Sequence, residues 1–212
     1  MEIETLNPYV IKILISAREE DSISSISERI NLSYGWTNKW ANKLIKEGIF
    51  REKWRGIILN EKNKQYQNII NFIKDNLNNV IFYYSVLNLF GIKYCFTKTD
   101  AVYIWSEGRY NVARYKDYYP IFVKIKKSDY PIFLQYCKKL NLKVNSKKKI
   151  FYIVEILKDF KCVKKETYFV DPLNETIDFM QKNIYNFQPG LEIISEIYNK
   201  KLNVHYKETN LF

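Results

Sequence analysis

The chain has 212 residues, of which 47% are hydrophobic, and a formal net charge of +11. This length and apolar content are enough for a core in one or two domains. No apolar run reaches about 18 residues, so we expect no transmembrane helix and no membrane partner. The first residues, MEIETLNPYVIKIL, start acidic and lack a basic region followed by a long apolar stretch, so we expect no signal peptide.

The cysteine and histidine content is low. Cys95, Cys137 and Cys162 are widely spaced and form no CxxC pair, and His205 is the only histidine. This usage argues against a disulfide framework and a zinc site, and it fits a reducing, cytoplasmic compartment. We interpret each cysteine as a small buried hydrophobic residue and His205 as a surface residue, and we expect neither metal nor cofactor.

The basic charge has two interpretations. A net charge of +11 favours binding to a polyanion such as nucleic acid. The chain is also rich in Lys, Ile, Asn and Tyr, a composition that AT-rich coding favours, so part of the lysine excess can be compositional. The positions of the basic residues therefore matter more than their number.

The N-terminal sequence predicts three helices. Asn7 and Pro8 are typical of a helix cap and a first helical residue, and the next apolar residues recur at helical spacing. Ser22 or Ser24 can cap a second, short helix. Ser33 can cap a third helix, which Gly48 ends.

The third predicted helix has two unlike faces. On a wheel turning about 100° per residue, one half holds Trp36, Thr37, Trp40, Ala41, Leu44 and Ile45. The other half holds Gly35, Asn38, Lys39, Asn42, Lys43 and Lys46, with Glu47 at the border. We therefore expect both tryptophans to anchor the helix on its own domain, with Trp36 near the edge that would face DNA. The acid-free lysine and asparagine face suits phosphates and base edges.

A hairpin follows this helix. Residues 49–53 and 57–59 read as strands, and Trp54-Arg55-Gly56 as the tight turn, with Gly56 supplying a positive φ. The order helix, helix, turn, helix, hairpin over residues 7–60 resembles the winged helix-turn-helix of archaeal and bacterial transcription regulators. The apolar set Ile26, Ile30 and Leu32 and the spacing from Leu44 to Gly48 carry this resemblance.

The resemblance implies a DNA-binding regulator. It implies that the third helix lies in the major groove of double-stranded DNA and the wing over the adjacent backbone. Residues 34–58 carry six basic and two acidic side chains. The candidate DNA contacts are Ser33, Tyr34, Asn38, Lys39, Asn42, Lys43, Lys46, Arg51, Lys53 and Arg55. The alternative is a structural or protein-binding winged helix whose lysines form a solvated face.

A fourth helix connects this region to the remainder. Residues 66–77 place apolar side chains at helical spacing, and such a connector also makes a dimer contact in many regulators, so a homodimer is one expected arrangement. The sequence NLNN at 76–79 predicts the boundary between a domain at 1–79 and a second at 80–212.

The second domain reads as α+β with a mostly antiparallel sheet. Residues 82–91 predict a short helix that Gly91 stops. Strands are expected at 101–105, 110–115, 121–127, 150–157 and 167–171, with a turn at Ser106-Glu107-Gly108. Helices are expected at 128–141 with Ser128 as cap, after Asp171 as cap with Pro172 first, and at 189–201.

Two stretches resemble the antitoxin of abortive-infection type IV toxin–antitoxin systems. SVLNLFGI at 85–92 is similar to that family's alanine-rich helix end, although Val86 replaces the expected small residue. YFVDPLNETIDFM at 168–180 is similar to its strand followed by an acidic helix start. The resemblance implies a DNA-binding autoregulator with a toxin as protein partner.

A nucleic-acid-processing enzyme is the alternative. TKTDAVYIW at 97–105 resembles nucleotidyltransferase strands, in which two carboxylates hold Mg²⁺. Here Asp100 is followed by Val102 where a second acid is required, and Glu155 is the only further candidate. We expect no active enzyme and no catalytic residue, and we favour a degenerate, non-catalytic relative of that fold over an active transferase.

The lysine-rich segment at 137–149, CKKLNLKVNSKKK, has six lysines and no acid. It is either a solvated loop or a second phosphate-contacting surface, with nearby tyrosines that could stack on bases. The favoured interpretation of the whole chain is a double-stranded-DNA-binding transcriptional regulator. Its second domain would dimerise, bind an effector or bind a partner.

Overall fold

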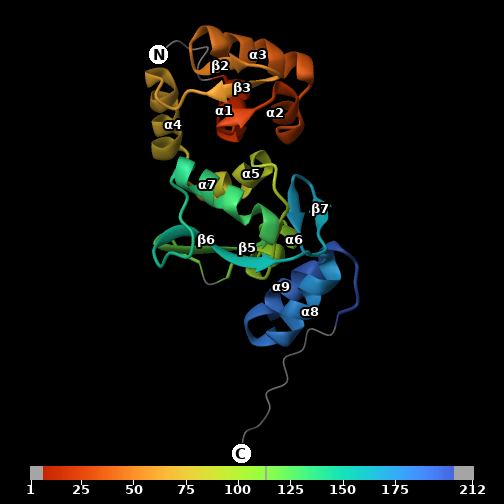
Figure 1. Cartoon of the computed structure of the whole chain (residues 1–212). Helices are drawn as coiled ribbons and strands as arrows, with labels where there is room; N and C mark the ends of the chain where they lie inside the picture. The colour runs from red at the N-terminus through yellow and green to blue at the C-terminus, as the bar shows by residue number, and fades with distance from the viewer. Residues whose placement is uncertain (1–6, 113, 203–212) are drawn as a thin grey trace, which may run out of the picture. The chain divides into compact units, whose positions relative to one another are not determined.

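A computed structural model describes residues 7–112 and 114–202 and has an α+β fold, as predicted (Figure 1). It divides into two compact units. Residues 1–92 and 131–142 form the first, and residues 93–130 and 143–212 form the second. The predicted boundary at 76–79 lies inside the first unit, between two of its helices. His205 lies outside the described residues.

The first unit combines helices with a small antiparallel sheet (Figure 1). Its helices are α1 (Pro8–Ser16), α2 (Ile23–Arg29), α3 (Tyr34–Lys46), α4 (Lys64–Asn76), α5 (Val80–Val86) with the 3-10 turn η2 (Leu87–Leu89), and most of α7 (Tyr130–Leu140). Its strands are β1 (Glu20–Asp21), β2 (Phe50–Lys53) and β3 (Gly56–Leu59), in the order β1-β3-β2.

The predicted starts of the first three helices are confirmed. Asn7, Ser22 and Ser33 each accept a hydrogen bond from a backbone N–H two or three residues further on, at 2.9, 3.0 and 3.4 Å. Each side chain thereby satisfies one of the donors that a helix start leaves unpaired. Gly48 has a φ of 69° directly after the end of α3, as predicted.

The core of the first unit is the set of apolar residues that recur at helical spacing. Buried members from the first four helices are Val10, Ile13, Leu14, Ile26, Trp40, Leu44, Tyr66, Ile69, Ile70 and Ile73. Because each helix of this unit buries one side, the opposite sides of α3 and α4 stay available to solvent.

The hairpin β2–β3 forms as predicted, but its turn is built differently. Trp54 and Arg55 are the two turn residues, and the positive φ, 59°, belongs to Arg55 rather than to Gly56. Gly56 is required for space, because a Cβ there would lie 2.6 Å from the carbonyl oxygen of Asp21. Strand β1, which the sequence did not predict, causes this close approach by pairing Asp21 with Ile57.

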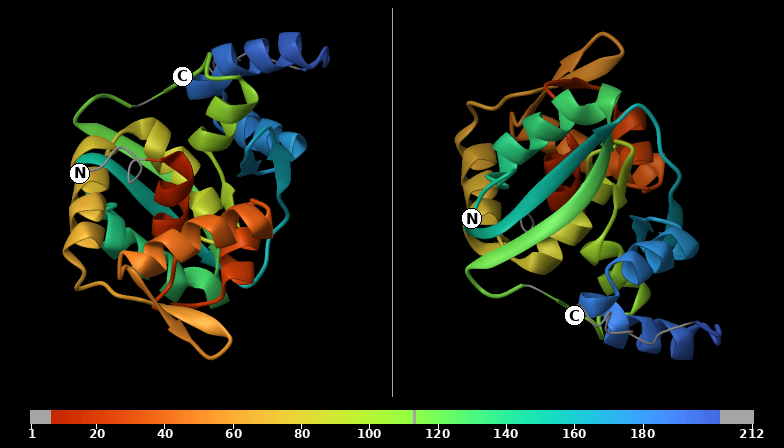
Figure 2. Two further views of the ribbon diagram at one scale, coloured as in Figure 1. Left: turned by 90° about the horizontal axis from the view of Figure 1, so that it is seen from above. Right: turned by 90° about the horizontal axis from the view of Figure 1, so that it is seen from below.

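The second unit contains a mixed five-stranded sheet with three helices. Its elements are β4 (Tyr94–Phe96), α6 (Thr99–Trp105), β5 (Tyr118–Lys126), the 3-10 turn η3 (Lys127–Asp129), β6 (Lys149–Leu157), β7 (Val163–Lys165), β8 (Tyr168–Val170), α8 (Leu173–Lys182) and α9 (Ile184–Ile197). The strand order is β6-β5-β4-β8-β7, and the long strands β5 and β6 run parallel, side by side (Figure 2). The pairs β4–β5 and β7–β8 are antiparallel, whereas β5–β6 and β4–β8 are parallel, so the sheet is mixed rather than mostly antiparallel.

Two predicted strands of this unit are wrong. Residues 101–105 lie in helix α6, and residues 110–115 form no named strand. Asp100, at the start of α6, is fully buried and accepts a hydrogen bond from the backbone N–H of Phe122. This tertiary contact favours the helix over the strand that the β-branched and aromatic residues of AVYIW suggest. The predicted turn at 106–108 follows the end of α6.

Helices α7, α8 and α9 match the predictions, with different starts. Ser128 lies in η3, two residues before the first residue of α7. Pro172 precedes the first residue of α8, and Asp171 does not cap it, because its carboxylate binds side chains at the sheet end. Helix α9 begins at Ile184 rather than at 189, so that Pro189 lies inside it. Helices α6, α8 and α9 share a core that contains Val102, Ile177, Met180, Phe187, Leu191 and Ile194.

Candidate nucleic-acid interface

Helix α3 is held by its inner face. Thr37, Trp40, Ala41 and Leu44 are buried, and the Thr37 hydroxyl donates a further hydrogen bond to the carbonyl of Ser33. The wheel placed all four of these residues on the packing side, and that prediction is confirmed. The orientation of α3 therefore fixes which side chains point to solvent.

The outer face of α3 presents most of the predicted contact residues. Ser33, Tyr34, Lys39, Asn42 and Lys46 are exposed, whereas Asn38 and Lys43 are half-buried. No carboxylate occurs between residues 33 and 46. A surface with amides and ammonium groups but no acid can donate hydrogen bonds to phosphate and to base edges without local repulsion.

The two tryptophans of α3 have different environments. Trp40 is buried, as predicted, whereas Trp36 is 48% exposed and therefore packs only in part. A wheel gives the direction of a side chain but not the extent of the neighbouring helices. Trp36 stacks on the ring of Tyr9 with centroids 5.7 Å apart, at the N-terminal end of α3.

The lysines of α3 lie against these rings. The Lys39 ammonium is 4.8 Å from the centroid of Trp36, and the Lys43 ammonium is 4.8 Å from that of Trp40. Such cation–π contacts attract an ammonium group to the ring face without neutralising its charge. The aromatic rings of α3 therefore partly position its ammonium groups.

The hairpin adds a second basic element to the same unit. Arg51, Lys53 and Arg55 are exposed, with Glu52 as the acid among them. The Lys53 ammonium forms an ion pair with Glu20 of β1 at 2.6 Å. Between Lys53 and Arg55, Trp54 is 85% exposed. The sequence prediction did not select Trp54, although an aromatic residue in a two-residue turn has little to pack against.

A buried ion pair anchors the hairpin through β1. Arg29 and Asp21 approach to 2.7 Å with side chains 6% and 4% exposed. Asp21 also accepts a hydrogen bond from the backbone N–H of Arg18. Since Asp21 pairs with β3, this network ties the hairpin to helix α2.

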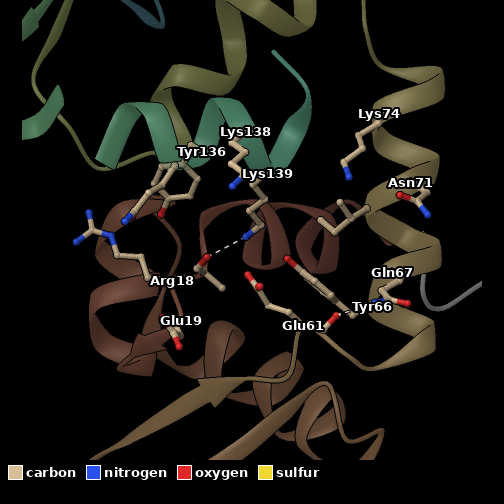
Figure 3. A pocket seen from close by; sticks show the side chains of 13 residues that line it. Arg18, Glu19, Glu61, Tyr66, Gln67, Asn71, Lys74, Tyr136, Lys138 and Lys139 are labelled. Atoms are coloured by element: carbon tan, nitrogen blue, oxygen red, sulfur yellow. Dashed lines mark hydrogen bonds between the residues drawn. The ribbon is translucent and has the colours of Figure 1, made fainter. Parts of the chain in front are cut away.

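The same unit contains a cavity of about 720 Å³ lined by the end of α1 and by α4 and α7 (Figure 3). Lys139 lies at its base and donates to the carbonyls of Leu14, Ile15 and Ala17 at 2.6, 3.1 and 2.9 Å. Burial lowers the pKa of Lys139 to about 7. Lys138 of α7 and Lys74 of α4 also line this cavity (Figure 3).

Lys139 differs in its environment from the other lysines of the lysine-rich segment at 137–149. It is half-buried, and its ammonium donates to carbonyls at the end of α1, where a cation is favourably placed, so it is not a freely solvated lysine. Lys138, Lys147, Lys148 and Lys149 are exposed. The segment is thus not one uniform surface of solvated lysines.

Asp100 and Glu155, the acids considered for catalysis in the second unit, each lie near a different basic side chain. The Asp100 carboxylate is 2.8 Å from the Arg114 guanidinium, and both side chains are essentially inaccessible. Glu155 is half-buried and lies 3.8 Å from Lys98. Within residues 7–112 and 114–202, no group of three or more His, Cys, Asp or Glu side chains could hold a metal ion. Asp100 is therefore the ion-pair partner of Arg114.

A second polar cluster gathers on Asp171. Lys124 of β5 donates to its carboxylate at 2.7 Å, and Thr97 and Cys95 donate to it as well. Burial raises the pKa of the Cys95 thiol, and the neighbouring Asp171 adds to this effect. The thiol therefore stays protonated and is a poor nucleophile. Cys95 and Cys137 are buried as predicted, whereas Cys162 is half-buried, and all three are free.

Comparison with known proteins yields no match, whether against family models, curated proteins or solved structures. In the part of the chain that the structure describes, no helix has both the length and the apolar character needed to cross a bilayer.

Proposed function

We propose that the first unit is a winged helix-turn-helix that binds double-stranded DNA, and that the protein is a transcriptional regulator. One observation carries the proposal. The outer face of α3 combines exposed Lys39, Asn42 and Lys46 with no carboxylate, and a basic hairpin follows it in the same unit.

In this proposal α3 enters the major groove. An α-helix fits the width of that groove, and a side-chain amide such as that of Asn42 can pair with an adenine edge in two hydrogen bonds. Lys39 and Lys46, about two turns apart on α3, would contact phosphates on either side. Phosphate contacts fix the register, whereas the amide supplies sequence preference.

The hairpin β2–β3 serves as the wing. It projects from the rest of the first unit in both views of Figure 2. Its exposed Arg51 and Arg55 would contact the backbone or the minor groove next to the helix. The network of Asp21 and Arg29 supports this role, because it holds the wing in place before DNA binds.

In this proposal the second unit has the regulatory role. It would hold an effector, a second copy of the chain or a protein partner such as a toxin, in a cytoplasmic setting. A homodimer would place two copies of α3 on a palindromic operator. Light scattering of the full chain with and without DNA distinguishes a dimer from a monomer.

The test is selection of bound fragments from sheared genomic DNA at two salt concentrations, followed by affinity measurements on the consensus. We expect Lys39→Ala/Asn42→Ala/Lys46→Ala to weaken binding by about 100-fold or more and to lower the salt slope by about 2. All three side chains are exposed, so the fold should persist.

The matched control is Lys147→Ala/Lys148→Ala. Like the α3 variant, it removes two positive charges from exposed positions, but in the second unit. Its affinity should stay near that of the wild type. A larger loss in this control than in the α3 variant would assign nucleic-acid binding to the lysine-rich segment. An α3 variant that binds like the wild type would refute the proposal.

A further inference from the structure

The hairpin tip carries a tryptophan that the protein does not bury. Trp54 is 85% exposed, more than any other large hydrophobic side chain in the described ranges. Tryptophan is usually highly buried, because its large apolar surface gains most from leaving water. Its own fold gives no packing reason for Trp54 at this position.

The backbone that carries Trp54 is well supported by strand pairing. It occupies a two-residue turn whose strands pair in register from Phe50–Leu59 to Lys53–Gly56. Strand β1 supports the other edge of β3, and the Lys53–Glu20 ion pair ties β2 to β1. The indole is therefore held at the end of a three-stranded support rather than on a long loop.

The mostly basic side chains around Trp54 indicate a negatively charged partner. The other exposed side chains of the hairpin are Arg51, Glu52, Lys53 and Arg55, and all are charged. The Arg55 guanidinium lies 5.7 Å from the indole centroid. A single aromatic ring flanked by cations is complementary to a DNA base step, because the ring can stack on the bases while the cations contact the flanking phosphates. A bilayer or an apolar protein surface favours a broader apolar patch.

We infer that Trp54 is a wedge that enters the minor groove of duplex DNA, partly unstacks one base step and bends the duplex. The inference rests on the proposed DNA binding of the first unit. Arg51 and Arg55 would hold the phosphates beside the wedge. The preferred step is a flexible pyrimidine–purine step such as TA, because unstacking costs least there.

The experiment uses the full chain and a selected duplex labelled at both ends for energy transfer. A second duplex carries 2-aminopurine at the TA step. Wild type should shorten the end-to-end distance and raise 2-aminopurine fluorescence. Trp54→Ala should bind about tenfold more weakly and leave the duplex straight, since stacking on one aromatic ring typically contributes this much or more. Trp54→Phe should restore part of the bend.

Two control variants isolate the wedge. Arg55→Ala should lower the affinity and the salt slope while keeping the bend. Tyr185→Ala removes another highly exposed aromatic ring, in the second unit, and should change neither quantity. Circular dichroism should be unchanged for all of these variants, because the altered side chains are exposed.

The outcomes separate the wedge from DNA binding itself. Wild type that binds tightly to straight duplex, with Trp54→Ala of equal affinity, overturns the wedge and leaves the proposed function standing. Wild type that binds no duplex overturns both. A blue shift of Trp54 fluorescence on anionic vesicles, without any DNA bend, would assign the ring to a lipid surface and also overturn the wedge.

Discussion

The basic residues of α3 and the hairpin differ from those at the sheet end of the second unit in burial and in partners. Lys39 is exposed and lies over an indole ring, whereas Arg114 is 1% exposed and pairs with Asp100. Lys124 is similarly shielded against Asp171. One chain therefore uses the same residue types in two ways.

This difference in burial determines whether a charged side chain can contribute to folding or to ligand binding. A buried charge has lost its hydration, so it must keep its partner, and it cannot also serve a ligand. An exposed charge contributes little to folding stability but keeps its full attraction for a polyanion. Burial rather than charge count therefore decides which basic side chains are available to a ligand, and Lys124 and Arg114 are not among them.

The largest expected effect concerns the buried pair. Arg114→Met should leave the Asp100 carboxylate buried without its guanidinium and lower the free energy of unfolding by about 3–5 kcal/mol. Urea denaturation of the full chain measures this. The double variant Arg114→Met/Asp100→Asn removes both charges and should recover much of the loss. A single variant within about 1 kcal/mol of wild type would erase the distinction between the two regions.

Lys139 lies between these extremes, since its side chain is half-buried and pairs with backbone carbonyls rather than with a carboxylate. Lys139→Met should leave three α1 carbonyls without their donor and cost about 1–3 kcal/mol. The pKa of Lys139 is lowered to about 7, while the unfolded chain keeps about 10.4. Between these pH values the unfolded state binds more protons, so the stability contributed by Lys139 rises with pH.

Denaturation of wild type and Lys139→Met at pH 7, 8.5 and 9.5 tests this sign. The wild type should gain stability relative to the variant at each step. The charged groups that face Lys139 include Glu61, Asp21 and Arg29. Parallel pH profiles would mean that the three carbonyls hold the ammonium charged throughout, with an ordinary pKa.

Local signals in the sequence predicted much of the first unit. The caps Asn7 and Ser33, the stop at Gly48 and the inner face of α3 follow from rules that act over a few residues. The exposed Lys39 and Asn42 of the candidate interface follow from the same wheel. Periodicity suffices where one helix face packs and the other meets water.

The features that were missed depend on distant partners. Strand β1 has two acidic residues and pairs only because β3 lies beside it. Helix α6 has a strand-like composition, and its buried Asp100 becomes intelligible only with Arg114 in place. The exposure of Trp36 depends on where the neighbouring helices end, and Lys139 is explained only by the carbonyls of α1. No local pattern encodes these contacts.

The smallest expected effect concerns the exposed pair of Lys53 and Glu20. Their ammonium and carboxylate are 2.6 Å apart, but both side chains are largely solvated, so Glu20→Gln should change the free energy of unfolding by less than about 1 kcal/mol. The same variant frees Lys53 from its carboxylate beside the proposed wing. Duplex affinity should therefore rise slightly at low salt and return to the wild-type value at high salt, where screening removes the gain. A drop in affinity at low salt would mean that the ion pair mainly positions the hairpin, so that support of the wing outweighs its charge.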